Sequence, residues 1–107
     1  MAILDEIAEQ EAAKNKAIRG YIIRSLGRGN ENTLLVRQLT NVMVADGLII
    51  SPDISKPLDY LKDGGYIEFT DRRANAYNAY RKDYAVRLTK KGVDLLEDTI
   101  HDPGVDV

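Results

Sequence analysis

Several residue types that carry chemistry are missing from this chain or nearly so. Its 107 residues include no cysteine and a single histidine, His101. Without cysteine there are no disulfides, no thiolate metal ligands and no cysteine nucleophile. One histidine leaves no partner for a histidine-based zinc site or a Ser/His/Asp triad. Asp59 and Asp63 share a helix face, but no base, nucleophile or phosphate loop accompanies them, so we expect no metal, no cofactor and no enzymatic activity.

Long uncharged apolar runs are also lacking, although 44% of the residues are hydrophobic. The sequence therefore predicts a packed soluble protein without a membrane span. Residues 1 to 11 carry four acidic side chains and no basic one, which is the wrong charge for the start of a secretion signal. We expect one cytoplasmic domain over residues 1–107, with one modest core.

The net charge of −2 conceals a segregation of charge along the chain. Residues 72 to 91 carry seven basic side chains and one acid, Asp83. Residues 12 to 28 carry five basic side chains and no acid, whereas residues 94 to 107 carry five acids and no lysine or arginine. Such asymmetry indicates either a nucleic-acid-binding face or a solvated hairpin whose charge is compensated elsewhere in the molecule.

Helical spacing of apolar residues predicts an N-terminal helix over about residues 3 to 27. The positions that fall roughly on one line of this helix are Ile3, Ile7, Lys14, Ile18, Ile22 and Leu26. Gly20 could weaken or divide the helix, and the run Gly27-Arg28-Gly29-Asn30 ends it, because glycine adopts a left-handed cap without a side-chain clash.

A helix-turn-helix pattern is predicted over about residues 33 to 63. Its first helix spans about residues 33 to 45, is capped by Asn32 or Thr33, and buries Leu35, Leu39, Val42 and Met43. The apolar run Leu48-Ile49-Ile50 that follows is either a short strand or a packed turn, since periodicity does not choose between them.

The second helix of this pattern is expected either to be regular over residues 55 to 63 or to be kinked after Asp53 by Pro57. Ser51-Pro52-Asp53 is typical of a helix start, and Pro57 fits without loss only in the opening turn, because proline has no N–H to donate. With Ile54, Leu58 and Leu61 facing inward, the outward side chains sum to zero charge; they are Ser55, Lys56, Asp59, Lys62 and Asp63.

Two strands are predicted at residues 66–70 and 83–88, joined by a polar, flexible tip. The tip combines basic side chains that could hold phosphates or enter a minor groove with amides that could add hydrogen bonds; these candidates are Arg72, Arg73, Asn75, Asn78, Arg81 and Lys82. The alternative is a solvated tip in which Tyr77 and Tyr80 cover the hairpin or a neighbouring subunit.

A C-terminal helix is expected over about residues 89 to 101, capped by Thr89 and stopped by Asp102-Pro103-Gly104. His101 near its end would interact favourably with the helix dipole. The N-terminal and C-terminal helices both carry apolar stripes, so we expect a homodimer through these two helices.

The order helix, two-strand hairpin, helix resembles the second half of a winged helix-turn-helix DNA-binding domain. The residues that carry the resemblance are Leu58, Leu61, Gly65, Tyr66 and Ile67, followed by Leu88-Thr89-Lys90-Lys91-Gly92. The resemblance implies an α+β fold that is mostly helical, with the hairpin as the wing. It implies double-stranded DNA as partner, touched by the wing and by a reading helix that offers Ser55, Lys56, Asp59 and Lys62. Pro57 in that helix departs from the family's usual pattern.

The chain is also similar to small winged-helix proteins of Mu-like phages and prophages, often labelled ArsR-like. The similarity rests on the run from Leu88 to Asp94, followed shortly by Pro103-Gly104-Val105. It implies a small phage or prophage regulator or accessory factor, while the lack of a cysteine or histidine cluster removes the metal sensing that the label suggests. The alternative is a protein-interaction module or phage assembly component without DNA binding.

Overall fold

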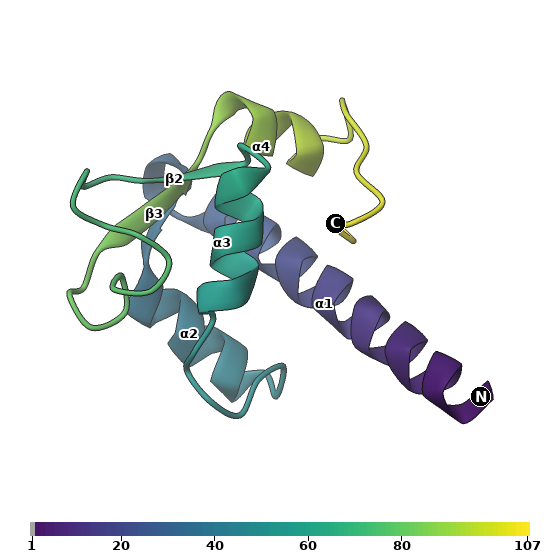
Figure 1. The fold of residues 1–107 in the computed structure, drawn as a ribbon. Helices are drawn as coiled ribbons and strands as arrows, with labels where there is room; N and C mark the ends of the chain where they lie inside the picture. Colours follow the sequence, from purple (N-terminus) through teal and green to yellow (C-terminus); the bar gives the residue numbers. More distant parts are fainter. Residues whose placement is uncertain (1) are drawn as a thin grey trace.

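A computed structural model describes residues 2–107 of the chain. The fold is α+β and mostly helical, as expected from the sequence (Figure 1). In chain order the elements are α1 (Ala2–Arg28), the 3-10 turn η1 (Asn30–Asn32), β1 (Thr33–Leu35), α2 (Val36–Ala45), α3 (Ser55–Asp63), β2 (Ile67–Phe69), β3 (Ala85–Leu88) and α4 (Lys90–Leu96).

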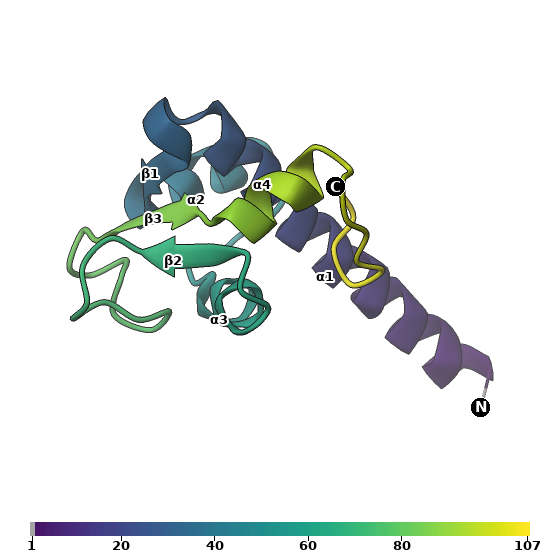
Figure 2. The same cartoon turned by 90° about the horizontal axis from the view of Figure 1, so that it is seen from above.

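The three strands form one small antiparallel sheet in the order β1-β3-β2. Thr33 of β1 lies opposite Arg87 of β3, and Ile67 of β2 lies opposite Leu88 of β3. The central strand β3 therefore joins the hairpin to a strand more than fifty positions earlier in the sequence. In both views the C-terminal end of α1 lies beside this sheet, and the N-terminal half of the helix extends away from the rest of the molecule (Figures 1 and 2).

One hydrophobic cluster joins the second half of α1 to the other helices and to the sheet. Its largest fully buried apolar side chains are Ile22, Ile23, Leu26, Val36, Leu39, Met43, Leu58, Leu61, Ile67 and Val86. Burial of such side chains is the main favourable term in folding, at roughly 25 cal/mol per Å² of apolar surface. The predictions of a helix over residues 55–63 and of inward-facing Ile54, Leu58 and Leu61 are confirmed.

The first half of α1 does not share this core. Ile3 and Ile7, expected on a continuous buried line, are 71% and 54% exposed, because the rest of the chain packs only against the second half of the helix. Gly20 does not divide the helix. A Cβ atom there would lie 1.7 Å from the carbonyl oxygen of Asp106, so glycine at this position lets the C-terminal segment lie against α1.

The predicted helix over residues 33 to 45 begins too early. Thr33–Leu35 is strand β1, and positive φ angles at Glu31 and Asn32 turn the chain into it. Since α2 starts only at Val36, its buried face differs from the one expected: Leu39 and Met43 are buried as predicted, but Leu35 and Val42 are 38% and 46% exposed.

The connection from α2 to α3 contains no strand at Leu48-Ile49-Ile50. The backbone N–H of Leu48 donates to the carbonyl of Met43 at 3.0 Å and closes the end of α2. Leu48 and Ile49 pack against the core, whereas Ile50 is 99% exposed. Of the two alternatives, the packed turn is the one observed.

The C-terminal helix is shorter than predicted. Thr89 caps it as expected, because its hydroxyl oxygen accepts a hydrogen bond from the backbone N–H of Gly92 at 3.1 Å. The helix ends at Leu96, and the left-handed conformation of Asp98 directs the chain back toward the core. His101 is therefore an exposed residue in the following segment, not the end of the helix.

Candidate nucleic-acid interface

The loop that joins β2 to β3 (residues 70–84, the β2–β3 loop) is anchored to the core. Ala76 and Ala79 are buried members of the hydrophobic cluster. The backbone N–H of Tyr84 donates to the carbonyl of Ala79 at 3.0 Å, which closes the returning part of the loop. The tip is therefore not wholly solvated, because two small alanine side chains pack into the core.

Asn75 and Asn78 hold the loop in shape. The Asn75 side-chain oxygen accepts from the backbone N–H groups of Tyr77 and Asn78 at 2.8 and 3.0 Å. The Asn78 side chain accepts from the Asn75 N–H at 2.8 Å and donates to the Arg73 carbonyl at 3.0 Å. Both side-chain oxygens and the Asn78 nitrogen are therefore engaged within the loop, whereas the Asn75 nitrogen keeps its capacity to donate.

Arg37 of α2 fastens the far end of this loop. Its Nε donates to the Asp83 carboxylate at 2.5 Å, and a terminal nitrogen donates to the Tyr80 carbonyl at 3.0 Å. Its guanidinium also lies over the Tyr80 ring, 4.6 Å from the centroid. The hydrogen bond to Asp83 raises the pKa of Arg37. This contact was not predicted, although Asp83 stands out in the sequence as the single acid among the basic residues 72–91.

Ion pairs divide the basic side chains of the hairpin into two groups. Arg73 pairs with Asp71 at 2.8 Å, and its hydrogen bonds lower the pKa of Asp71 to about 2. Arg87 pairs with Glu68 at 2.6 Å. Arg72, Arg81 and Lys82 are exposed and take part in no ion pair among residues 2–107. These three side chains, the unpaired cations of the loop, present a net positive charge to solvent.

The start of α3 is fixed by a local hydrogen-bond cap. The Asp53 carboxylate accepts from the backbone N–H of Ser55 at 3.0 Å and from its hydroxyl at 2.6 Å, and these bonds lower the pKa of Asp53. Pro57 is the third residue of the helix, where its missing N–H leaves no hydrogen bond unmade. Ser55 is thus engaged in the cap, while Lys56 and Lys62 are exposed on the outer side of α3.

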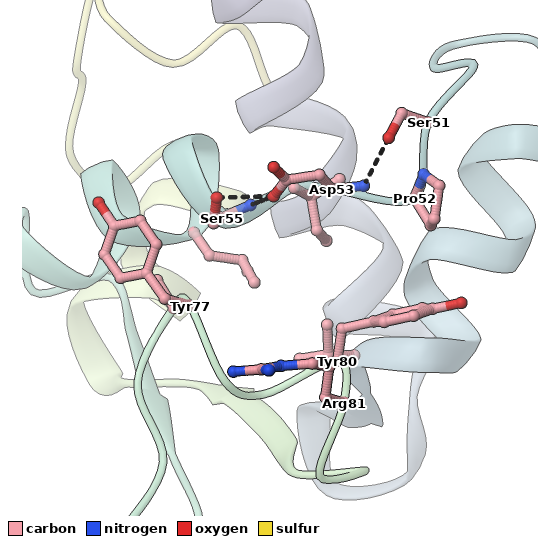
Figure 3. Close-up of a pocket in the computed structure, with 11 residues that line it drawn as sticks. Ser51, Pro52, Asp53, Ser55, Tyr77, Tyr80 and Arg81 are labelled. Carbon is pink, nitrogen blue, oxygen red and sulfur yellow. Dashed lines mark hydrogen bonds between the residues drawn. The ribbon is translucent and has the colours of Figure 1, made fainter.

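A pocket of about 270 Å³ lies between the β2–β3 loop and the start of α3 (Figure 3). Ser51, Pro52 and Asp53 lie on one side of it, and Tyr80 and Arg81 on the opposite side. Buried apolar side chains also line it, namely Val36, Ile54, Leu58 and Ala76.

A second groove of about 420 Å³ lies between α1 and α3 and includes Lys56 and Asp59. Tyr77, which is 64% exposed, lines both the pocket and the groove. The pocket thus brings together the predicted residues Ser55 and Arg81, and the groove brings together Lys56 and Asp59. Arg72, Lys82 and Lys62 line neither hollow.

The arrangement offers cationic side chains and hydrogen-bonding groups. Within residues 2–107, no group of three histidine, cysteine or acidic residues is placed to hold a metal ion. Over the same described part of the chain, every helix is too short or too polar to cross a bilayer.

No family model, curated protein or solved structure matches the sequence.

Proposed function

We propose that this chain is a double-stranded DNA-binding protein of the winged helix-turn-helix type. In this proposal α2 and α3 form the helix-turn-helix, α3 is the reading helix, and the β2–β3 loop is the tip of the wing. The element order α2, α3, β2, β3, α4 supports it, since this is the order that the sequence resemblance implies. The similarity to small phage and prophage proteins suggests a regulator or accessory factor.

The observation that carries the proposal is the presence of three unpaired cations, Arg72, Arg81 and Lys82, on one anchored loop. Phosphate contacts by arginine and lysine supply most of the sequence-independent affinity for duplex DNA. The buried alanines and the Asn75 and Asn78 hydrogen bonds hold the loop in one shape, so little loop entropy is lost when phosphates bind.

The exposed side of α3 supports a second contact, in the major groove. Lys56 and Lys62 can donate to guanine, and Asp59 can accept from a cytosine amino group. Acidic side chains on the same helix repel phosphate, so α3 adds discrimination between sequences more than it adds affinity. The loop cations would position the protein, and α3 would select the bases.

The main alternative is a protein-interaction module, and the exposure of Tyr77 favours it. Tyrosine beside an apolar pocket is typical of the centre of a protein contact. A contact of this kind needs no phosphate and depends weakly on salt. Salt dependence therefore separates the two functions.

The test compares unpaired with paired basic side chains of the hairpin. In one variant Arg72, Arg81 and Lys82 are replaced by alanine, and in the control Arg73 and Arg87, which are held by Asp71 and Glu68, are replaced. We expect the first variant to bind duplex DNA more weakly, with a salt slope that is shallower by about 0.9 for each phosphate that the protein no longer binds. The control should retain most of the slope.

A third variant separates positioning from reading. Replacing Lys56 and Lys62 by alanine should change the preference among duplex sequences more than it changes the salt slope of non-specific binding. Equal reductions of affinity in the first variant and in its control would contradict the assignment of the loop as the phosphate-binding element.

A further inference from the structure

The first half of α1 buries none of its side chains from residue 3 to residue 16 against the rest of the described chain. All of these side chains are exposed, including Leu4 and Ile7 at 64% and 54%. An isolated helical segment of about 12–15 residues is marginal in water, so helices of this length depend on packing. Both views show this half of α1 projecting away from the body of the molecule (Figures 1 and 2).

The exposed apolar side chains continue a seam that is buried further along the same helix. Leu4, Ile7, Glu11, Lys14 and Ile18 alternate in steps of three and four residues, which is the spacing of a coiled-coil seam (the α1 seam). Ile18 belongs to the hydrophobic core, whereas Leu4 and Ile7 face solvent. Two positions in the middle of the α1 seam carry opposite charges, Glu11 and Lys14.

These two charges select both the occupant of the seam and its direction. In a parallel pair of identical helices, Glu11 would face Glu11 and Lys14 would face Lys14, which is repulsive. In an antiparallel pair, the register that places Glu11 opposite Lys14 also brings Ile7 of one copy to the groove between α1 and α3 of the other, which Ile18 lines. Symmetry makes each of these contacts occur twice. The other charges along α1 also favour the antiparallel direction. All charged side chains of residues 3–11 are acidic, and all those of residues 14–28 are basic.

The geometry points to a second copy of this chain as the partner: we propose a homodimer in which the two α1 helices pair antiparallel through the α1 seam. In this dimer the apolar surface that pairs with the second copy lies on α1 alone. The apolar side chains of α4 and the segment after it that were expected to share the interface, Val93, Leu96 and Ile100, already pack against the core of their own chain. The dimer would present two copies of the β2–β3 loop, but it does not depend on DNA binding.

Charge exchange at the centre of the seam tests the dimer and its direction. Light scattering should give the wild-type protein twice the 12.0 kDa mass of one chain. Glu11→Lys turns attraction into repulsion only in the antiparallel pair, because in a parallel pair position 11 faces a like charge before and after the exchange. In the antiparallel dimer it should weaken self-association roughly a hundredfold or more. Lys14→Glu should do the same. The double exchange E11K/K14E leaves the net charge unchanged and should restore the dimer.

Glu9→Lys is the matched control, because Glu9 is on the side of the helix opposite the seam and the change in net charge is the same. Circular dichroism confirms that each variant keeps its helix content. A monomeric wild-type protein at high concentration would overturn the proposal, as would Glu11→Lys associating as well as Glu9→Lys, or a double exchange that stays monomeric. The readout is a mass without DNA, so failure here is separate from failure of the DNA-binding proposal.

Discussion

Replacing Leu61 by alanine should remove a large part of the protein's stability. Leu61 lies on α3, is fully buried, and belongs to the cluster that joins α1, α3 and the hairpin. Leucine-to-alanine changes at such sites lower the free energy of unfolding by roughly 2 to 5 kcal/mol, because apolar packing is removed and a cavity remains. A chain of this size is stable by roughly 5 to 15 kcal/mol, so the change is severe.

The same destabilisation can be expressed as a shift of the thermal midpoint. Unfolding entropies of about 2.1 cal/mol/K per residue give roughly 0.2 kcal/mol/K for the whole chain, so the midpoint should fall by about 10 to 20 °C. Thermal and urea unfolding followed by circular dichroism measure both quantities. Val42→Ala, at a 46% exposed position on α2, serves as the control and should shift the midpoint far less. Equal shifts in the two variants would refute the inward orientation of Leu61 and with it the orientation of α3.

Two further predictions concern the C-terminal segment. The hydroxyl of Tyr66 donates to the Asp102 carboxylate, which lowers the pKa of Asp102, while burial together with this contact raises the pKa of Tyr66 to about 12. Because the pKa of Asp102 is lowered by folding, this carboxylate stabilises the protein above the unfolded pKa of about 4, and the stabilisation is lost as the pH falls below that value. Asp102→Asn should therefore flatten the acid side of the plot of unfolding free energy against pH. Parallel plots for wild type and variant would count against this contribution. Gly20→Ala should destabilise the full chain, because the new Cβ would lie 1.7 Å from the Asp106 carbonyl oxygen. In a chain shortened by residues 106 and 107 the same change should stabilise, by up to about 1 kcal/mol, since alanine favours the helix more than glycine does.

The sequence predicted those parts of the fold that are governed by local pattern. Helix α3 follows from the spacing of Leu58 and Leu61 and from Pro57, which fits only an opening turn. The short strand β1 was missed because its pairing is non-local: Thr33 faces Arg87, and nothing near Thr33 in the sequence indicates that partner. The exposure of the first half of α1 could likewise not be predicted from local pattern, since the spacing of Ile7 is the same whether or not another element covers it.

The candidate site divides in the same way. Its basic character could be read from composition, but which cations are unpaired depends on contacts that form only in the folded chain. Arg73 is neutralised by Asp71, and Asn75 and Asn78 are used in the loop itself, whereas Arg72 and Arg81 remain without an acidic partner among the described residues. A local motif does indicate the first pairing, because Asp71 and Arg73 are only two positions apart.

The most direct test of the proposed function is the affinity of the wild-type protein for duplex DNA as a function of salt concentration. Fluorescence anisotropy with a labelled duplex, titrated from low to moderate salt, gives the slope of log affinity against log salt. If each of the three unpaired loop cations contacts a phosphate, the slope should be about −2.7, and it should be steeper if the lysines of α3 also contribute. No measurable affinity at low salt, where electrostatic binding is strongest, would contradict DNA binding and would favour the protein-interaction module.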